Sequence, residues 1–259
     1  MERIRVRFLV VRKKTIGLCL LLAAAFAVLI LSTAGTKSSA VFLGYTSRQL
    51  PVYNVETAEK KVAISFDAAW GEDNTEKILR ALNEHGVKAT FFLTGFWTRK
   101  NPGLVKSLDG SGMEIGTHSN THPYMTKLDD TKLDLELSMS KASVTEITGK
   151  EVTLFRAPFG DYSDRVLNAC KRASLTAVQW DTDSYDWKEL PAKEMAERVL
   201  SRVKPGSIAL FHTDGKYTAE ALPAILMGLK NKGYQVTTVG DLFIIGESYI
   251  DHAGTMRKK

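Results

Sequence analysis

A pair of histidines offers the first candidate for chemistry in this chain. His118 and His122 are four residues apart, and at that spacing two imidazoles on one helical turn can face the same ion. Two histidines at this spacing are often only a solvated surface pair. The chain holds five histidines in all, and His118 comes directly after an apolar run, which favours metal ligation. A third ligand is then needed, and a carboxylate commonly supplies it.

Asp67 offers a candidate general base. It directly follows the apolar run 62–66, where a carboxylate without a partner would be costly. It could be a helix cap or a turn residue, or it could deprotonate a water molecule. Arg156 also ends an apolar run and could hold such a carboxylate ionised through a bidentate contact. A structural ion pair would look the same in sequence.

His212 offers a candidate general acid. It ends the apolar run 207–211, where a lone histidine is usually a satisfied core residue. Asp186 changes this interpretation, because a carboxylate bonded to one ring nitrogen fixes the tautomer and raises the imidazole pKa. Such an acid suits an amine leaving group. Trp187 and Leu210 could wall a small apolar pocket beside it, although core packing explains them equally well.

The elements that must position these groups alternate along the chain. Apolar runs that predict strands are followed by helical patterns that end at glycines or begin near prolines. Alternating strands and helices predict a parallel sheet, whose carboxyl ends deliver their side chains to one face. We expect a distorted or incomplete (β/α) barrel of about seven βα units. An open doubly wound sheet is the alternative, but no glycine-rich phosphate fingerprint follows any run. The expected strands are 62–66, 89–93, 113–117, 152–155, 175–180, 207–211 and 235–239, and the expected helices are 75–85, a short one after 102, 129–148, 163–173, 192–203 and 219–232.

The amino terminus explains the basic balance of the chain. The formal net charge is +6, yet residues 1–14 hold six basic residues and one acidic residue, so they account for +5. Nucleic-acid binding is therefore not indicated. The uncharged stretch 15–36 is about long enough to cross a bilayer, and the cations before it predict a cytoplasmic amino terminus. We expect a single-pass membrane anchor with the rest of the chain outside the cytoplasm; a secreted form after signal cleavage is the alternative.

Four segments follow from this organisation. Residues 1–35 form a basic tail and transmembrane segment, 36–60 a connector, 61–245 the catalytic domain, and 246–259 a carboxyl-terminal tail. A short edge strand is expected near 52–55 in the connector.

The motifs together resemble the polysaccharide deacetylases of the NodB-homology type, a carbohydrate esterase family. His-Ser-X-X-His is matched at 118–122, Arg-X-Pro-X-Gly-Asp at 156–161, Asp-X-X-Asp-Trp at 183–187 and Leu-X-His at 210–212. They occur in the family's order over roughly residues 60–240. The residues 65–71 and the amino-terminal anchor most resemble the PdaB-type sporulation proteins.

This resemblance implies a role for each matched residue. Asp67 would be the catalytic base with Arg156 as its partner, and His212 would be the acid, oriented by Asp186. His118 and His122 would bind a divalent metal, usually zinc. The backbone near Pro158 and Phe159 would hold the oxyanion, while Trp187 and Leu210 would cradle the acetyl methyl group. The implied reaction is metal-assisted hydrolysis of N-acetyl groups on an amino-sugar polysaccharide, with peptidoglycan or spore cortex glycan as the expected substrate.

The chain departs from the family at one ligand. The family reads Thr-Phe-Asp-Asp-Gly, and its second Asp binds the metal, whereas Ala68 stands there in this chain. A methyl group cannot coordinate a cation. The metal would then be held by the two histidines with water and substrate, or Glu72 or Asp73 would reach in, or the domain would bind glycan with impaired catalysis. An intracellular enzyme acting on phosphorylated metabolites is disfavoured by the amino-terminal segment.

Overall fold

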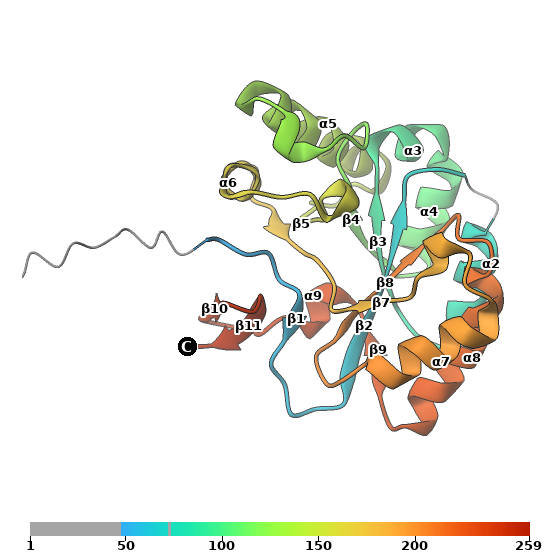
Figure 1. The fold of residues 1–259 in the computed structure, drawn as a ribbon. Helices are drawn as coiled ribbons and strands as arrows, with labels where there is room; N and C mark the ends of the chain where they lie inside the picture. Colours follow the sequence, from blue (N-terminus) through green and yellow to red (C-terminus); the bar gives the residue numbers. More distant parts are fainter. Residues whose placement is uncertain (1–47, 72–73) are drawn as a thin grey trace, which may run out of the picture. The chain divides into compact units, whose positions relative to one another are not determined.

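A curled sheet of eight parallel strands organises the protein (Figure 1). The computed structural model describes residues 48–71 and 74–259. The sheet order is β6-β5-β4-β3-β2-β8-β7, and β9 pairs with the first residues of β2. The two edge strands, β6 and β7, do not pair with each other. The structure thus confirms the predicted incomplete (β/α) barrel. The strands are β2 Lys61–Ala68, β3 Thr90–Leu93, β4 Glu114–Thr117, β5 Leu154–Phe155, β6 Thr176–Ala177, β7 Thr182–Asp183, β8 Ile208–His212 and β9 Gln235–Thr237.

Helices cover the outside of the sheet, and most lie where the sequence predicts them. The longest, α5, begins after Asp129, whose carboxylate accepts a hydrogen bond from the backbone N–H of Lys132, and it ends at Gly149, whose φ of 69° only glycine adopts readily. The helices are α2 Thr75–Glu84, α3 Gly95–Lys100, α4 Pro102–Gly110, α5 Asp130–Thr148, α6 Asp164–Arg172, α7 Ala192–Arg202, α8 Thr218–Asn231 and α9 Val239–Leu242.

Strand β2 divides the molecule into two chemically different layers. Successive side chains of a strand point to opposite faces, so Phe66 and Ala68 join the apolar layer packed against the helices. The Phe66 ring lies 4.9 Å from that of Phe91 in this layer, measured between ring centroids. Ser65 and Asp67 face the interior of the half-barrel, where both contact the side chain of Arg156. The same strand therefore builds the core and carries the polar site.

A second, small sheet joins the two ends of the described chain. Strand β1 (Asn54–Val55) pairs with β11 (Thr255–Lys258), which pairs in turn with β10 (Ser248–Ile250). The segment 246–259, which we expected to be a tail, thus contains two paired strands. Gly206 lies against this region, because a Cβ there would be 1.7 Å from the carbonyl oxygen of Val55.

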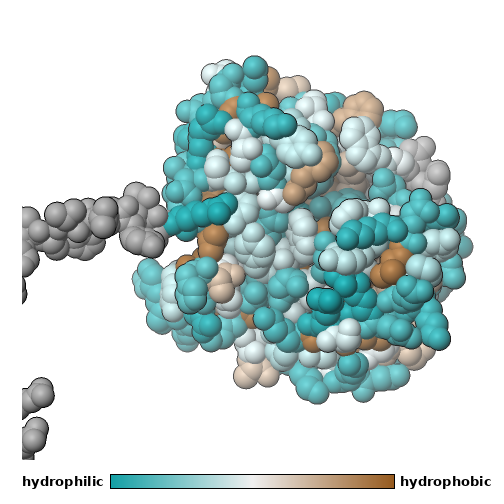
Figure 2. All heavy atoms as spheres, viewed as in Figure 1, coloured by the Kyte–Doolittle hydropathy of each residue, from teal (hydrophilic) through white to brown (hydrophobic). Residues whose placement is uncertain are grey.

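The predicted transmembrane segment lies outside the described residues. Within 48–71 and 74–259, no helix is both long and apolar enough to span a bilayer. The face in Figure 2 is mainly hydrophilic, with hydrophobic side chains in scattered small groups instead of one broad apolar area.

Candidate active site

The carboxyl ends of the strands surround a pocket of about 580 Å³. Asp67 lies near the end of β2, His118 follows β4, Asp186 follows β7, and His212 ends β8. Eight of the ten predicted site residues line this pocket: Asp67, His118, His122, Phe159, Asp186, Trp187, Leu210 and His212. The other two, Arg156 and Pro158, are buried close to it. Groups far apart in sequence are therefore brought to one place.

Asp67 and Arg156 form a buried ion pair. Arg156 Nη1 donates to Asp67 Oδ1 at 2.7 Å, and Arg156 is fully buried. Its Nη2 donates to Ser65 Oγ at 2.9 Å and to the Gln179 carbonyl oxygen at 3.1 Å. Burial acts to raise the pKa of Asp67, but the guanidinium of Arg156 and the neighbouring imidazoles hold it below its ordinary value. Asp67 is consequently a carboxylate at neutral pH.

His118 is fixed with one ring nitrogen toward the site. Its Nδ1 lies 2.8 Å from the Arg156 carbonyl oxygen, which can only accept, so Nδ1 carries the proton. Its Nε2 is 3.6 Å from Asp67 Oδ2. Burial lowers the pKa of His118, and the nearby Asp67 carboxylate offsets only part of that. A neutral imidazole with a fixed Nδ1–H is the usual state of a metal-ligating histidine.

The two histidines lie in a loop between β4 and α5, and the helical turn that their spacing would allow is not formed. Ser119 and His122 have φ of 67° and 63°, in the left-handed region. This sharp backbone path, and not a helical spacing, brings the His118 and His122 rings to 4.9 Å between centroids. Burial and the neighbouring His118 lower the pKa of His122 to about 4.

Glu136 holds that loop from helix α5. Its Oε2 accepts the backbone N–H groups of Asn120 and Thr121 at 2.7 and 2.8 Å, and its Oε1 accepts the Thr121 hydroxyl at 2.6 Å. Three hydrogen bonds to one carboxylate offset the cost of two left-handed residues. Sequence reasoning missed Glu136, because nothing in a helical pattern distinguishes it from a solvated glutamate.

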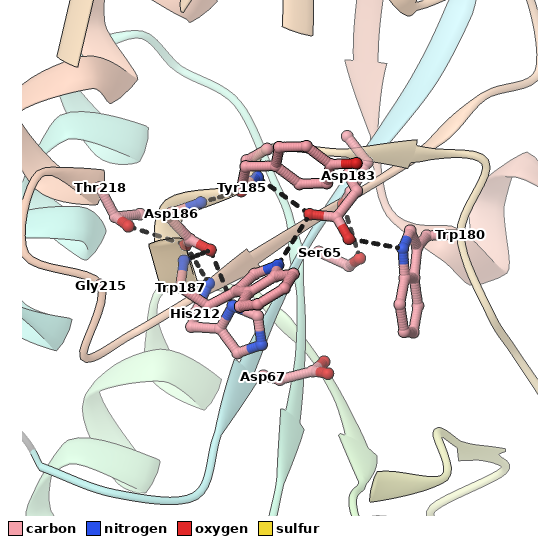
Figure 3. A network of polar contacts seen from close by, with 12 residues as sticks. Ser65, Asp67, Trp180, Asp183, Tyr185, Asp186, Trp187, His212, Gly215 and Thr218 are labelled. Atoms are coloured by element: carbon pink, nitrogen blue, oxygen red, sulfur yellow. Dashed lines mark hydrogen bonds and ion pairs between the residues drawn. The ribbon is translucent and has the colours of Figure 1, made fainter. Parts of the chain in front are cut away.

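His212 and Asp186 form the other half of the site. Asp186 Oδ1 lies 2.8 Å from His212 Nδ1, and its Oδ2 accepts the His212 backbone N–H at 2.6 Å (Figure 3). The Thr218 hydroxyl and the Trp187 backbone N–H donate to the same carboxylate at 2.8 Å each. Burial alone would lower the pKa of His212, but the Asp186 carboxylate raises it to about 9. His212 is therefore a cation at neutral pH, with Nε2 as its other ring donor.

Ala68, at the position of the second Asp of the family motif, is not among the residues that line the pocket. Its side chain is fully buried in the apolar layer, on the opposite face of β2 from Asp67. Ala69 lines the pocket, followed by Trp70. Strand β2 ends at Ala68, and Ala69 lies in the bend that follows it. The Ala69 side chain faces the pocket there.

The donor set suits a metal only in part. His118 and His122 are neutral and adjacent, as metal ligation requires. Within the described residues, however, no group of three or more His, Cys, Asp or Glu side chains could hold a metal ion. Glu72 and Asp73 lie outside the described residues.

Several pocket-lining residues were not predicted from the sequence. Asp183 and Trp180 extend the wall beside Trp187, and Asp214 lies two residues beyond His212. Burial raises the pKa of Asp214, which the nearby His212 partly counteracts. Glu189 and Lys216 pair across the rim at 3.0 Å. Asp183 was visible in the sequence as part of a motif, but its contacts were not.

Comparison with known proteins places this architecture in a family. The polysaccharide deacetylase family model matches residues 54–178. A peptidoglycan N-acetylglucosamine deacetylase of Bacillus cereus is 34% identical over 204 residues, which cover 77% of this chain and 93% of that protein. The peptidoglycan N-acetylmuramic acid deacetylase PdaA of Bacillus subtilis is 34% identical over 73% of this chain and 74% of its own length. The chain spans 60% of YlxY, an uncharacterised Bacillus subtilis protein with 34% identity.

Solved structures agree with the sequence relatives. A CE4 family pseudoenzyme from Bacillus anthracis superposes with a TM-score of 0.72 at 32% identity, over 74% of this chain and 68% of that one. A peptidoglycan N-acetylglucosamine deacetylase in complex with a hydroxamate-type benzamide also gives 0.72 at 30% identity, over 74% and 92% of the two chains. The chain belongs to the polysaccharide deacetylase family, and its structural relatives include a protein named a peptidoglycan N-acetylglucosamine deacetylase and a CE4 family pseudoenzyme.

Proposed function

We propose that this protein hydrolyses N-acetyl groups on an amino-sugar polysaccharide, with peptidoglycan as the substrate. One observation carries the proposal: a carboxylate held ionised and an imidazole held protonated line the same pocket. Two titratable groups whose environments push their pKa values apart identify a base and an acid. The names of the relatives support the substrate class.

The roles of the side chains follow from their protonation states. Asp67 accepts a proton from the water that attacks the acetyl carbonyl carbon, and Arg156 keeps it ionised until then. His212 donates its proton to the sugar nitrogen as the carbon–nitrogen bond breaks, so the products are a free amine and acetate. Asp186 holds the imidazole ring and stabilises its cation. A divalent ion, which we propose to be zinc, would polarise the carbonyl and activate the water when bound.

The test is release of acetate from N-acetylated peptidoglycan fragments by the full-length chain, with and without added zinc. Release that depends on Asp67 and His212 supports the proposal. No release under any metal condition would end the enzyme interpretation. We also propose that the protein lies outside the cytoplasm, is anchored in the membrane and acts in sporulation. A soluble, shortened form in cell fractionation would favour a secreted protein over an anchored one.

A second candidate function is glycan binding with impaired catalysis. The incomplete metal donor set in the described residues favours it, as does the pseudoenzyme among the structural relatives. Binding of N-acetylated glycan fragments without any acetate release separates this candidate from the first.

A further inference from the structure

Two tryptophans that line the pocket share one carboxylate. Trp180 Nε1 donates to Asp183 Oδ2 at 3.3 Å, and Trp187 Nε1 donates to Asp183 Oδ1 at 3.3 Å. Figure 3 shows Asp183 between the two indoles, and Trp187 lying between Asp183 and His212. All three residues line the same cavity.

Asp183 is itself held by the backbone around it. Its Oδ1 also accepts the Tyr185 backbone N–H at 2.9 Å, and its carbonyl oxygen accepts Arg198 Nε at 2.8 Å. The Arg198 guanidinium lies 3.3 Å from the centre of the Tyr185 ring. Tyr185 has a φ of 62°, a costly conformation for this residue. Arg198 of helix α7 therefore holds the loop that carries Asp183 and Tyr185.

Few contacts hold Trp187, which is 55% exposed. The Tyr185 ring lies 5.9 Å from it between centroids, and Lys188 Nζ lies 4.7 Å from its centre. The bond to Asp183 is the hydrogen bond of its indole N–H. The N–H of a tryptophan needs an acceptor, and Asp183 supplies it. Leu210, opposite Asp183 in the pairing of β7 with β8, is 2% exposed and cannot move in the same way. One wall of the pocket, Leu210, is thus buried in the core. The opposite wall, Trp187, is held by its hydrogen bond to the Asp183 carboxylate.

We propose that Asp183 is a positioning residue that holds Trp187 in place as one wall of the acyl pocket and so limits the size of the acyl group. This inference rests on the proposed deacetylase function. The side-chain contacts of Asp183 are with N–H donors of the wall and its loop, and not with His212 or Asp67. The Asp183 charge also favours the cation of Arg156, so its effect through Trp187 is isolated by combining substitutions at both positions.

The experiment compares two acyl groups. The ratio of kcat/KM for N-acetyl over N-propionyl glucosamine oligomers is measured on the full-length chain. One methylene against a hydrophobic wall is worth about 10- to 200-fold, so the wild type should prefer acetyl by roughly tenfold or more. Asp183→Ala should reduce that preference to within about threefold of unity. Asp183→Asn, which keeps one acceptor oxygen, should lie between the two.

A double substitution of Asp183 and Trp187 distinguishes a positioning role of Asp183 from a general effect on structure. Trp187→Phe removes the indole N–H and should lower the preference as Asp183→Ala does. Adding Asp183→Ala to Trp187→Phe should change it little further. Asp134→Ala, which removes an exposed carboxylate paired with Arg172 on α6, is the control and should keep the wild-type ratio. An unchanged ratio in Asp183→Ala, or additive effects of the two substitutions, would overturn the proposal.

A binding measurement separates this inference from the proposed function. Acetate and propionate affinities are measured by calorimetry, which needs no turnover. If the wild type releases no acyl group, the proposed function fails, yet a preference for acetate that Asp183→Ala removes still supports the wall. Equal affinities in the wild type, or a preference that survives Asp183→Ala, would refute it.

Discussion

The two sides of the pocket are built to different degrees of completion. On the β7–β8 side, the Asp186 carboxylate is 1% exposed and accepts four hydrogen bonds, including both from His212. On the β4 side, His118 and His122 lie together with neutral rings, but the described residues supply no third metal ligand. Within the described residues, the proposed acid thus has all its hydrogen-bond partners, whereas the proposed metal site has two ligands. The comparison teaches that proton transfer and metal binding can be tested separately here.

The largest expected effect comes from removing the acid or the base. Asp67→Asn and His212→Gln should each lower kcat for acetate release by about 10²- to 10⁴-fold, because each abolishes one proton transfer. The matched control is His252→Gln, at an exposed position between β10 and β11, which should leave kcat unchanged. Full activity in either pocket variant would show that the side-chain roles are assigned wrongly.

Substitutions at positions 68 and 69 test which of the two can supply a third metal ligand. Ala68→Asp places a carboxylate in the apolar layer and should lower the free energy of unfolding by about 3 kcal/mol or more. Ala69→Asp enters the pocket and should tighten zinc binding on the order of tenfold, since it offers a third ligand. Denaturant unfolding and zinc calorimetry on both variants give the answer. Tighter zinc binding in Ala68→Asp instead would restore the placement expected from the family motif.

Gly215 tests the acid side by steric means. A Cβ there would lie 2.2 Å from Thr218 Oγ1 and 2.9 Å from Asp186 Oδ2. Gly215→Ala must therefore displace the Asp186 carboxylate or the Thr218 hydroxyl that is bonded to it. We expect kcat for acetate release to fall roughly tenfold and the free energy of unfolding by about 1–3 kcal/mol. Gly110→Ala is the control, because nothing lies within 4 Å of a Cβ added there. Equal behaviour of the two variants would mean that the contact is easily relieved.

Glu136 gives the smallest effect. Glu136→Gln replaces one accepting oxygen with an amide group that cannot accept the loop N–H groups, so the histidine loop should loosen. Zinc affinity should fall by roughly three- to tenfold, and the free energy of unfolding should fall by about 1–3 kcal/mol as the loop loses accepted hydrogen bonds. Glu146→Gln, an exposed position on the same helix, should leave zinc affinity as in the wild type. Identical zinc affinities in both variants would show that Glu136 does not support the histidine loop in metal binding.

Sequence patterns predicted the strand ends and therefore the meeting of the pocket residues, because parallel strands place their carboxyl ends at one face. The patterns could not predict the local backbone. The left-handed backbone at 119 and 122 could not be predicted, since the hydrogen bonds that hold the residues between them come from Glu136 in helix α5. They also could not show which way positions 68 and 69 face, because that depends on where strand β2 ends. Gly215 and Thr218 gain their roles only from tertiary contacts with Asp186. Asp183 contacts Trp180 and Trp187 within one short stretch of sequence, and only the backbone path there shows that the side chains meet.

The pH dependence of kcat/KM for acetate release tests the acid–base pair most directly. Asp67 has a lowered pKa and must be ionised, so the acidic limb should lie below the ordinary pKa of an aspartate. His212 must be protonated, and its pKa is raised to about 9, so activity should hold through neutral pH and fall as pH rises through 9. The account predicts a plateau between these limbs and loss of the basic limb in His212→Gln. A decline centred near pH 6.5, the ordinary histidine value, would contradict it.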